Sequence, residues 1–309
     1  MPGLFDIDGP QLDRAYVNIR AADHPGTREI REVIEQMWPV YESYADPGFA
    51  QGFAQDVDAR FWEMYLGCTL LEAGRTLLPA NQRQRAGGQP DLCVLEGERR
   101  IWIEAIAPGG GDPGPDQVVQ PMNGVFTAPT RQTQLRLSSA FFTKAQKLAR
   151  YLQQGVIAPD EPRIIAISGS RLGGVVFEVP LPPILNVLFP VGDAYITVNR
   201  LSGEVVNQGF HHSPVIERGQ GEIPRTAFLV DNFSHVSGVI WSSVGLGNMS
   251  RKVRPISYVH NPRAQVALPL SWGIWDREYV LIEHEDGSVV QDILAAPPAN
   301  SPLIGSLTN

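Results

Sequence analysis

The stretch Gln89–Pro108, QPDLCVLEGERRIWIEAIAP, decides the fold that this sequence predicts. Two short apolar runs, 91–95 and 100–106, flank a glycine-containing turn, which is the pattern of a β-hairpin. Each strand carries one acidic residue among apolar neighbours: Asp91 follows a proline at the start of the first strand, and Glu104 lies in the middle of the second. A carboxylate loses hydration in such a strand, and a metal ion or a proton would offset that cost.

The two acids have the chemistry of a metal site. Side chains alternate along a strand, so we expect Trp102, Glu104 and Ile106 on one face of the sheet. Carboxylates on adjacent strands can jointly hold a hard divalent cation such as Mg²⁺. The pattern also leaves open an ordinary hairpin, in which Asp91 lies near a turn and Glu104 pairs with an arginine.

Pro90-Asp91, followed after a strand by Glu104-Ala105, resembles the signature of the PD-(D/E)XK nuclease superfamily, and in particular its uncharacterised bacterial members. The resemblance implies a restriction-endonuclease-like core, Mg²⁺- or Mn²⁺-dependent phosphodiester hydrolysis, metal ligation by Asp91 and Glu104, and DNA as the partner. One position departs from the signature, because Ile106 stands where the family has lysine. Either the amine comes from another element, or the fold does not cleave.

A helix expected at 56–73 places a further acidic residue before the hairpin. Glu63 lies there among mostly apolar helical neighbours, and nucleases of this superfamily often carry an acidic residue at the corresponding place. The resemblance therefore adds Glu63 to the catalytic residues. The alternative is a glutamate at the edge of a wide apolar stripe, paired with Arg60.

A long helix expected at 129–154 offers the missing amine. Its apolar seam includes Phe141 and Leu148, and Lys144 falls in that seam, three residues after the first and four before the second. A lysine there points toward the protein, so Lys144 is our candidate for the catalytic amine. Lys147 falls among polar helical neighbours, and we expect it in solvent.

Four polar residues are candidates for substrate contacts. Arg83 and Arg85 lie in a turn-rich loop just before Asp91, and Arg131 and Gln134 lie in the first two turns of the long helix. They could contact phosphates, but loops and helix surfaces of this composition are more often only solvated.

Composition and the order of segments indicate the class of protein and its division into parts. Of 309 residues, 43% are hydrophobic and 19% charged, which is typical of a soluble globular protein, and the net charge of −8 argues mildly against bulk affinity for nucleic acid. We find no apolar stretch long enough to span a membrane, and expect a cytoplasmic protein that makes no membrane contact and could form a homodimer. We divide the chain into an N-terminal arm and helix (1–54), loosely packed up to residue 26, one nuclease-like domain (55–290), and a tail (291–309).

The fold expected is α/β, with a mixed central sheet flanked by helices. The apolar run 163–168 should be a parallel neighbour of the Glu104 strand, joined to it by the long helix in a right-handed crossover. Later runs, near 194–199, 236–242, 255–259 and 280–284, should supply further strands, most of them as a C-terminal extension of the sheet. The leading function is Mg²⁺-dependent cleavage of DNA, and the alternative is an inactive nuclease-like fold that serves as a nucleic-acid or protein interaction module.

Overall fold

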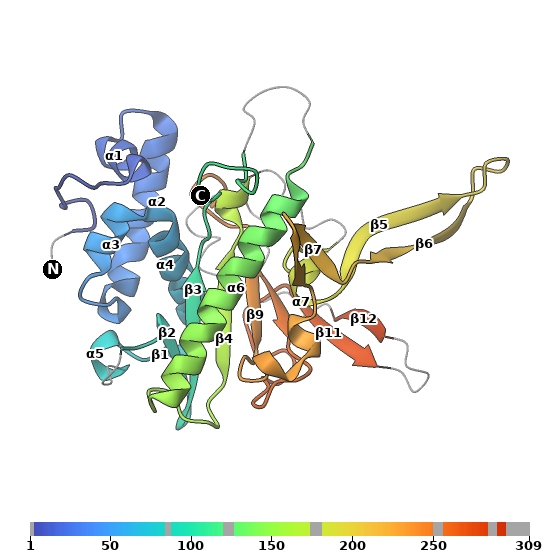
Figure 1. The fold of residues 1–309 in the computed structure, drawn as a ribbon. Helices are drawn as coiled ribbons and strands as arrows, with labels where there is room; N and C mark the ends of the chain where they lie inside the picture. Colours follow the sequence, from blue (N-terminus) through green and yellow to red (C-terminus); the bar gives the residue numbers. More distant parts are fainter. Residues whose placement is uncertain are drawn as a thin grey trace.

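The fold is seen in a computed structural model, which describes residues 3–83, 88–119, 127–173, 181–249, 256–283 and 289–294. A mixed sheet of eight strands forms the centre, and helices cover both of its faces (Figure 1). This arrangement confirms the expected α/β class. In the described part of the chain, no helix combines the length and the apolar character that crossing a bilayer requires.

The helices are α1 (Arg14–Ala21), α2 (Pro25–Tyr41), α3 (Phe49–Gln55), α4 (Val57–Glu72), α5 (Ala80–Arg83), α6 (Thr130–Gln153) and α7 (Leu185–Leu188), with short 3₁₀ turns at Glu42–Tyr44, Ser170–Leu172, Ala227–Leu229 and Asp231–Phe233. The strands of the central sheet, in spatial order, are β1 (Thr76–Leu77), β2 (Leu92–Glu96), β3 (Arg99–Ile106), β4 (Arg163–Ser168), β9 (Gly238–Ser242), β10 (Ile256–His260), β11 (Arg277–Glu283) and β12 (Val289–Leu294). Two separate ribbons pair β5 (Val191–Val198) with β6 (Val205–His212), and β7 (Val215–Arg218) with β8 (Gly221–Pro224).

The β2–β3 hairpin lies in the sheet as the sequence predicted. Its strands pair from Leu92 opposite Ile103 to Glu96 opposite Arg99, so the connecting turn has only two residues. The first of them, Gly97, has a φ of 63°, a left-handed conformation that glycine adopts without the steric cost of a side chain. The length of this turn therefore sets the register of the hairpin.

β3 separates two hydrophobic cores. Ile101 and Ile103 face one core together with residues of α4, whereas Trp102 faces the other core together with residues of α6. The strand's period of two residues places its even-numbered side chains, Glu104 among them, on the α6 side.

The crossover from β3 through α6 to β4 confirms a second prediction. β4 pairs with β3 in parallel, and Glu104 lies opposite Ile165. The observed α4 and α6 begin and end within one residue of the expected bounds. Asp56 caps α4, because its Oδ1 accepts a hydrogen bond of 3.2 Å from the Ala59 amide.

The expectation of a loosely packed N-terminal arm is wrong. Leu4, Phe5 and Tyr16 are buried in the core that also contains α4. The Tyr16 hydroxyl donates to the Leu4 carbonyl at 3.1 Å, which fastens the first residues to α1. Aromatic packing between segments far apart in sequence secures this region, and local composition does not reveal such contacts.

The later strands extend the sheet as expected, with two differences. The β5–β6 ribbon projects from the body of the molecule instead of joining the sheet (Figure 1). β12 reaches Leu294, so the segment assigned to a tail from residue 291 begins inside a strand. The rest of that tail lies outside the described residues.

Candidate active site

Asp91 and Glu104 meet at one positively charged group. Lys144 Nζ lies 2.6 Å from Glu104 Oε2 and 3.3 Å from Asp91 Oδ2. The Glu104 side chain has no exposed surface, and that of Lys144 is 13% exposed. The prediction that Lys144 points toward the two acids is confirmed, as is the prediction that the acids lie close enough to share one cation.

The prediction for Lys147 is wrong. Its Nζ lies 2.9 Å from each of the two carboxylate oxygens of Glu104, so it belongs to the cluster and not to the solvated face of α6. The same ammonium group lies 5.6 Å from the centre of the Tyr151 ring, a cation–π distance. A signal for this position existed, since Lys147 follows Lys144 by three residues and side chains with that spacing are neighbours on a helix.

A backbone hydrogen bond orients Asp91, which immediately precedes β2 (Leu92–Glu96). The Ala105 amide of β3 donates to Asp91 Oδ2 at 2.7 Å. Burial opposes ionisation of Asp91, but the positive charges of Lys144 and Lys147 and the Ala105 amide outweigh it, so the pKa of Asp91 is lowered from its ordinary value. Asp91 is therefore ionised at neutral pH.

Burial and the neighbouring charges act in opposite directions on the pKa values of Glu104 and Lys144. Burial, assisted by the negative charge of Asp91, raises the pKa of Glu104 to about 7 although both ammonium groups act to lower it. Burial also acts to lower the pKa of Lys144, but the charges of Asp91 and Glu104 reverse this effect and leave it above its ordinary value. The amine thus stays protonated, and Glu104 exchanges its proton near neutrality.

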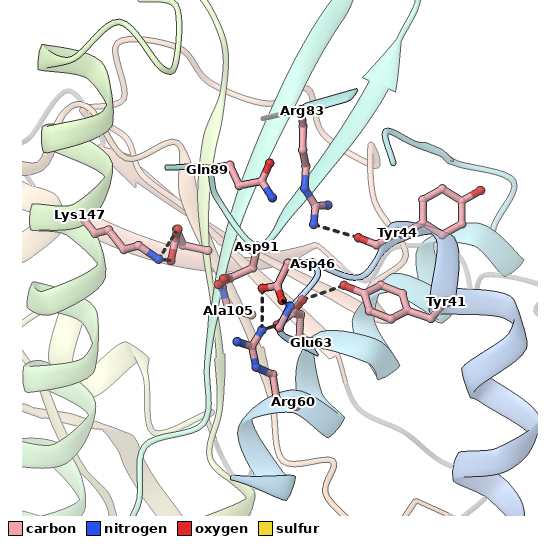
Figure 2. Close-up of polar contacts among 12 residues, drawn as sticks. Tyr41, Tyr44, Asp46, Arg60, Glu63, Arg83, Gln89, Asp91, Ala105 and Lys147 are labelled. Carbon is pink, nitrogen blue, oxygen red and sulfur yellow. Dashed lines mark hydrogen bonds and ion pairs between the residues drawn. The ribbon is translucent and has the colours of Figure 1, made fainter. Parts of the chain in front are cut away.

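Glu63 reaches the cluster from the other side of the sheet. In Figure 2, Asp91 lies between Lys147 on one side and Glu63 on the other. Glu63 accepts hydrogen bonds from Tyr41 Oη at 2.8 Å and from Arg60 Nη1 at 2.7 Å. Burial and the charge of Asp91 raise the pKa of Glu63 to about 7. The pairing of Glu63 with Arg60, which the sequence offered as the alternative to a site role, is observed. Asp91 acts on Glu63 through its charge, whereas Glu104 lies on the α6 side of β3.

A close approach at Gly67 holds Tyr41 against Glu63. The Tyr41 ring packs directly against Gly67 of α4, and a Cβ on Gly67 would lie 2.4 Å from Tyr41 Cε2. Both Tyr41 and Gly67 are buried, so the ring has little room to move away.

We expect Gly67→Ala to destabilise the protein by about 1–3 kcal/mol, because the added methyl group overpacks a filled core. Chemical denaturation measures the free energy of unfolding. Gly9→Ala is the matched control, since nothing lies within 4 Å of a Cβ at that position. Equal stability of the two variants would contradict the packing described.

The four residues expected to contact substrate are not seen beside Asp91 and Glu104 in the described part of the chain. Arg83 is buried at the end of α5, not exposed in a loop, and its Nη2 donates to the Tyr44 carbonyl at 2.9 Å. Arg85 lies outside the described residues. Gln134 is buried and accepts a hydrogen bond from Arg225, and Arg131 contacts Asp116 and neighbouring carbonyls. Among the described residues, none of the hydrogen bonds of Arg83, Arg131 and Gln134 involves Asp91 or Glu104, so their substrate role stays a prediction.

The donor set at the centre fits a hard divalent cation. Asp91 and Glu104 supply carboxylate oxygens, which Mg²⁺ prefers, and they already accommodate one positive group between them. Over the described ranges, no three Asp, Glu, His or Cys side chains are grouped tightly enough to hold a metal ion by themselves. A magnesium ion at Asp91 and Glu104 would thus take its other ligands from water and substrate, which is usual for this ion.

Comparisons of the chain with protein-family models, with curated proteins and with solved structures found no match. The site therefore has to be interpreted from its own residues.

Proposed function

We propose that this protein is a Mg²⁺-dependent phosphodiesterase that cleaves DNA, with a nuclease-like site built on the β2–β3 hairpin. The observation that carries the proposal is the position of Lys144. Its amine lies within hydrogen-bonding distance of both acids, although it comes from α6 and not from position 106 of the strand. The geometry thus supplies the amine that the sequence pattern lacks.

Each residue has a role that follows from its surroundings. Asp91 and Glu104 would hold the magnesium ion, which when bound supplies Lewis-acid activation of a water molecule and of the phosphate. Lys144, which stays protonated, would stabilise the negative charge that develops on the phosphate in the transition state. Glu63 would assist indirectly, because it interacts electrostatically with Asp91 from the opposite face of the sheet.

The direct test is conversion of supercoiled plasmid DNA to nicked or linear forms. We expect the wild-type protein to convert it with Mg²⁺ or Mn²⁺ and to stop when a chelator is added. A Glu104→Ala protein purified in the same way serves as the control for a contaminating nuclease. Intact plasmid after prolonged incubation with either metal would contradict the proposal.

We expect cleavage to depend on pH with a midpoint near 7 at limiting Mg²⁺. The pKa of Glu104 is raised to about 7 from an ordinary 4.5, so the group is protonated below pH 7 and ionised above it. A metal ligand must be deprotonated, so the rate should fall as the pH drops through 7. Raising the Mg²⁺ concentration should move the midpoint to lower pH, because metal and proton compete for one carboxylate. A midpoint near 4.5 that does not respond to Mg²⁺ would contradict this assignment.

A second candidate function is an inactive nuclease-like fold that binds nucleic acid or protein. The observation favouring it is that the acids already have cationic partners: Lys144 and Lys147 for Asp91 and Glu104, and Arg60 for Glu63. Titration with Mn²⁺ separates the two candidates, since a site that has lost catalysis has no need of the ion. Binding of a short DNA duplex with neither Mn²⁺ binding nor cleavage would favour the second candidate.

A further inference from the structure

A cleft of about 490 Å³ lies along the flank of α6 that faces away from the acids. Leu135, Ser138, Ser139 and Phe142 line it, and their spacing of three, four and seven residues places them on one face of the helix. The volume is within the range of about 300–1,000 Å³ that is typical of small-molecule sites. Of the described residues that make up the candidate active site, none lines this cleft.

Arg131 ties the walls of the cleft together. Its Nη1 donates to Asp116 Oδ1 at 2.8 Å and to the Glu217 carbonyl at 3.2 Å, and its Nη2 donates to the Pro115 carbonyl at 3.0 Å. These bonds connect the start of α6 to the loop after β3 and to the β7–β8 ribbon, which form the other two walls. These contacts therefore join the three walls of the cleft to one another.

The two ends of the cleft differ in chemistry. At one end, Phe142 is 49% exposed, and its ring makes a T-shaped contact with Phe233, with the ring centres 6.2 Å apart at 74°. This contact holds the ring and leaves part of its surface open to a flat partner. The hydroxyl groups of Ser138 and Ser139, one turn earlier, are available as hydrogen-bond donors and acceptors.

The other end offers cationic groups with donors to spare. Within the described part of the chain, Arg136 makes one hydrogen bond, from Nε to the Gly109 carbonyl, so its Nη groups are free for a ligand. Arg218 is 65% exposed, and its Nε lies 3.5 Å from Asp116 Oδ2. Arg131 and Arg218 both pair with Asp116 and offset its charge, so that Asp112 is the other carboxylate among the lining residues and Arg136 the other cation.

We propose that the cleft binds a nucleotide, with the base against Phe142 and the phosphate at Arg136 and Arg218. An aromatic ring that stacks on any base and guanidinium groups that pair with phosphate are the two elements that such a ligand requires. The cleft lies on another face of α6 from Lys144, so this inference does not depend on the proposed hydrolysis.

Isothermal titration calorimetry with adenosine 5′-monophosphate tests the proposal. We expect saturable binding, and weaker binding of both adenosine and ribose 5-phosphate, each of which lacks one of the two recognised groups. Phe142→Ala should weaken binding about fivefold to more than a hundredfold, the range for loss of one base–aromatic stack. Arg218→Gln should also weaken it. Tighter binding of a short oligodeoxyadenylate than of the monophosphate would identify a strand, and not a free nucleotide, as the source of the ligand.

Matched controls separate the cleft from general surface effects. Leu201→Ala and Arg200→Gln remove an exposed apolar side chain and an exposed charge from the distant tip of the β5–β6 ribbon, and should leave binding unchanged. Lys144→Met should also bind normally, which distinguishes failure of this site from failure of the active site. Absence of binding at millimolar monophosphate, or equal affinity in the wild type, Phe142→Ala and Arg218→Gln, would overturn the proposal.

Discussion

Lys144→Met is expected to lower the rate of DNA cleavage about 100- to 1,000-fold while the protein still binds Mn²⁺. Methionine keeps most of the volume of the lysine stem but removes the charge that lies 2.6 Å from Glu104 and 3.3 Å from Asp91. The expected factor is that for the loss of one preorganised group that stabilises transition-state charge. The two carboxylates that would hold the metal remain, so binding should survive. Plasmid cleavage and calorimetric titration with Mn²⁺ measure the two quantities separately.

Arg150→Met is the matched control, since it removes a positive charge from an exposed position of the same helix. It should cleave at the wild-type rate. Lys147→Met is informative beside it, because of the two acids Lys147 contacts only Glu104. Its substitution should lower the cleavage rate less than that of Lys144 if contact with both acids is what matters. A Lys144→Met protein that cleaves normally would remove the amine from the mechanism and leave the interaction module as the better proposal.

Glu104→Ala is expected to abolish cleavage and also to destabilise the fold by about 3 kcal/mol, the lower end for removing one partner of a buried ion pair. From the sequence alone, the same substitution would relieve an unpaired buried charge and leave the fold intact or slightly stabilised. The structure reverses that expectation, because Glu104 is ion-paired with both Lys144 and Lys147. Without it, Lys144 stays largely buried with only Asp91 as a partner.

Urea denaturation measures this loss, and Glu98→Ala is the control, because Glu98 is exposed in the turn of the same hairpin. A double variant, Glu104→Ala with Lys144→Met, should recover part of the stability, since it removes the uncompensated charge as well. Unchanged stability of Glu104→Ala would show that the two lysines turn into solvent at little cost.

The sequence predicted those features that local pattern controls. The hairpin, α4, α6 and β4 follow from apolar periodicity with clear stop signals, and Lys144 follows from its place in the seam of α6. Lys147 did not follow, because its direction depends on the length and flexibility of its stem: from the edge of the polar face it still reaches a carboxylate on the neighbouring strand.

Long-range packing explains the other differences. The burial of Tyr16 and the insertion of Tyr41 above Gly67 join segments that the chain brings together only when it folds. The burial of Arg83 has the same origin, since Arg83 donates to the carbonyl of Tyr44, a residue far from it in sequence. A single sequence contains no periodic signal for such contacts.

The two-residue turn at Gly97 lies at the far end of the hairpin, yet it determines which face of the sheet carries the Glu104 side chain. β3 presents odd-numbered residues to one core and even-numbered residues to the other, so a change at this turn that shifts the pairing register by one residue would exchange the two faces. Glu104 would then be turned into the apolar packing of α4, and an isoleucine would meet the lysines of α6. The turn thus sets which residues of β3 face each core. A change in its length should therefore impair the site far more than a change in its exposed side chains.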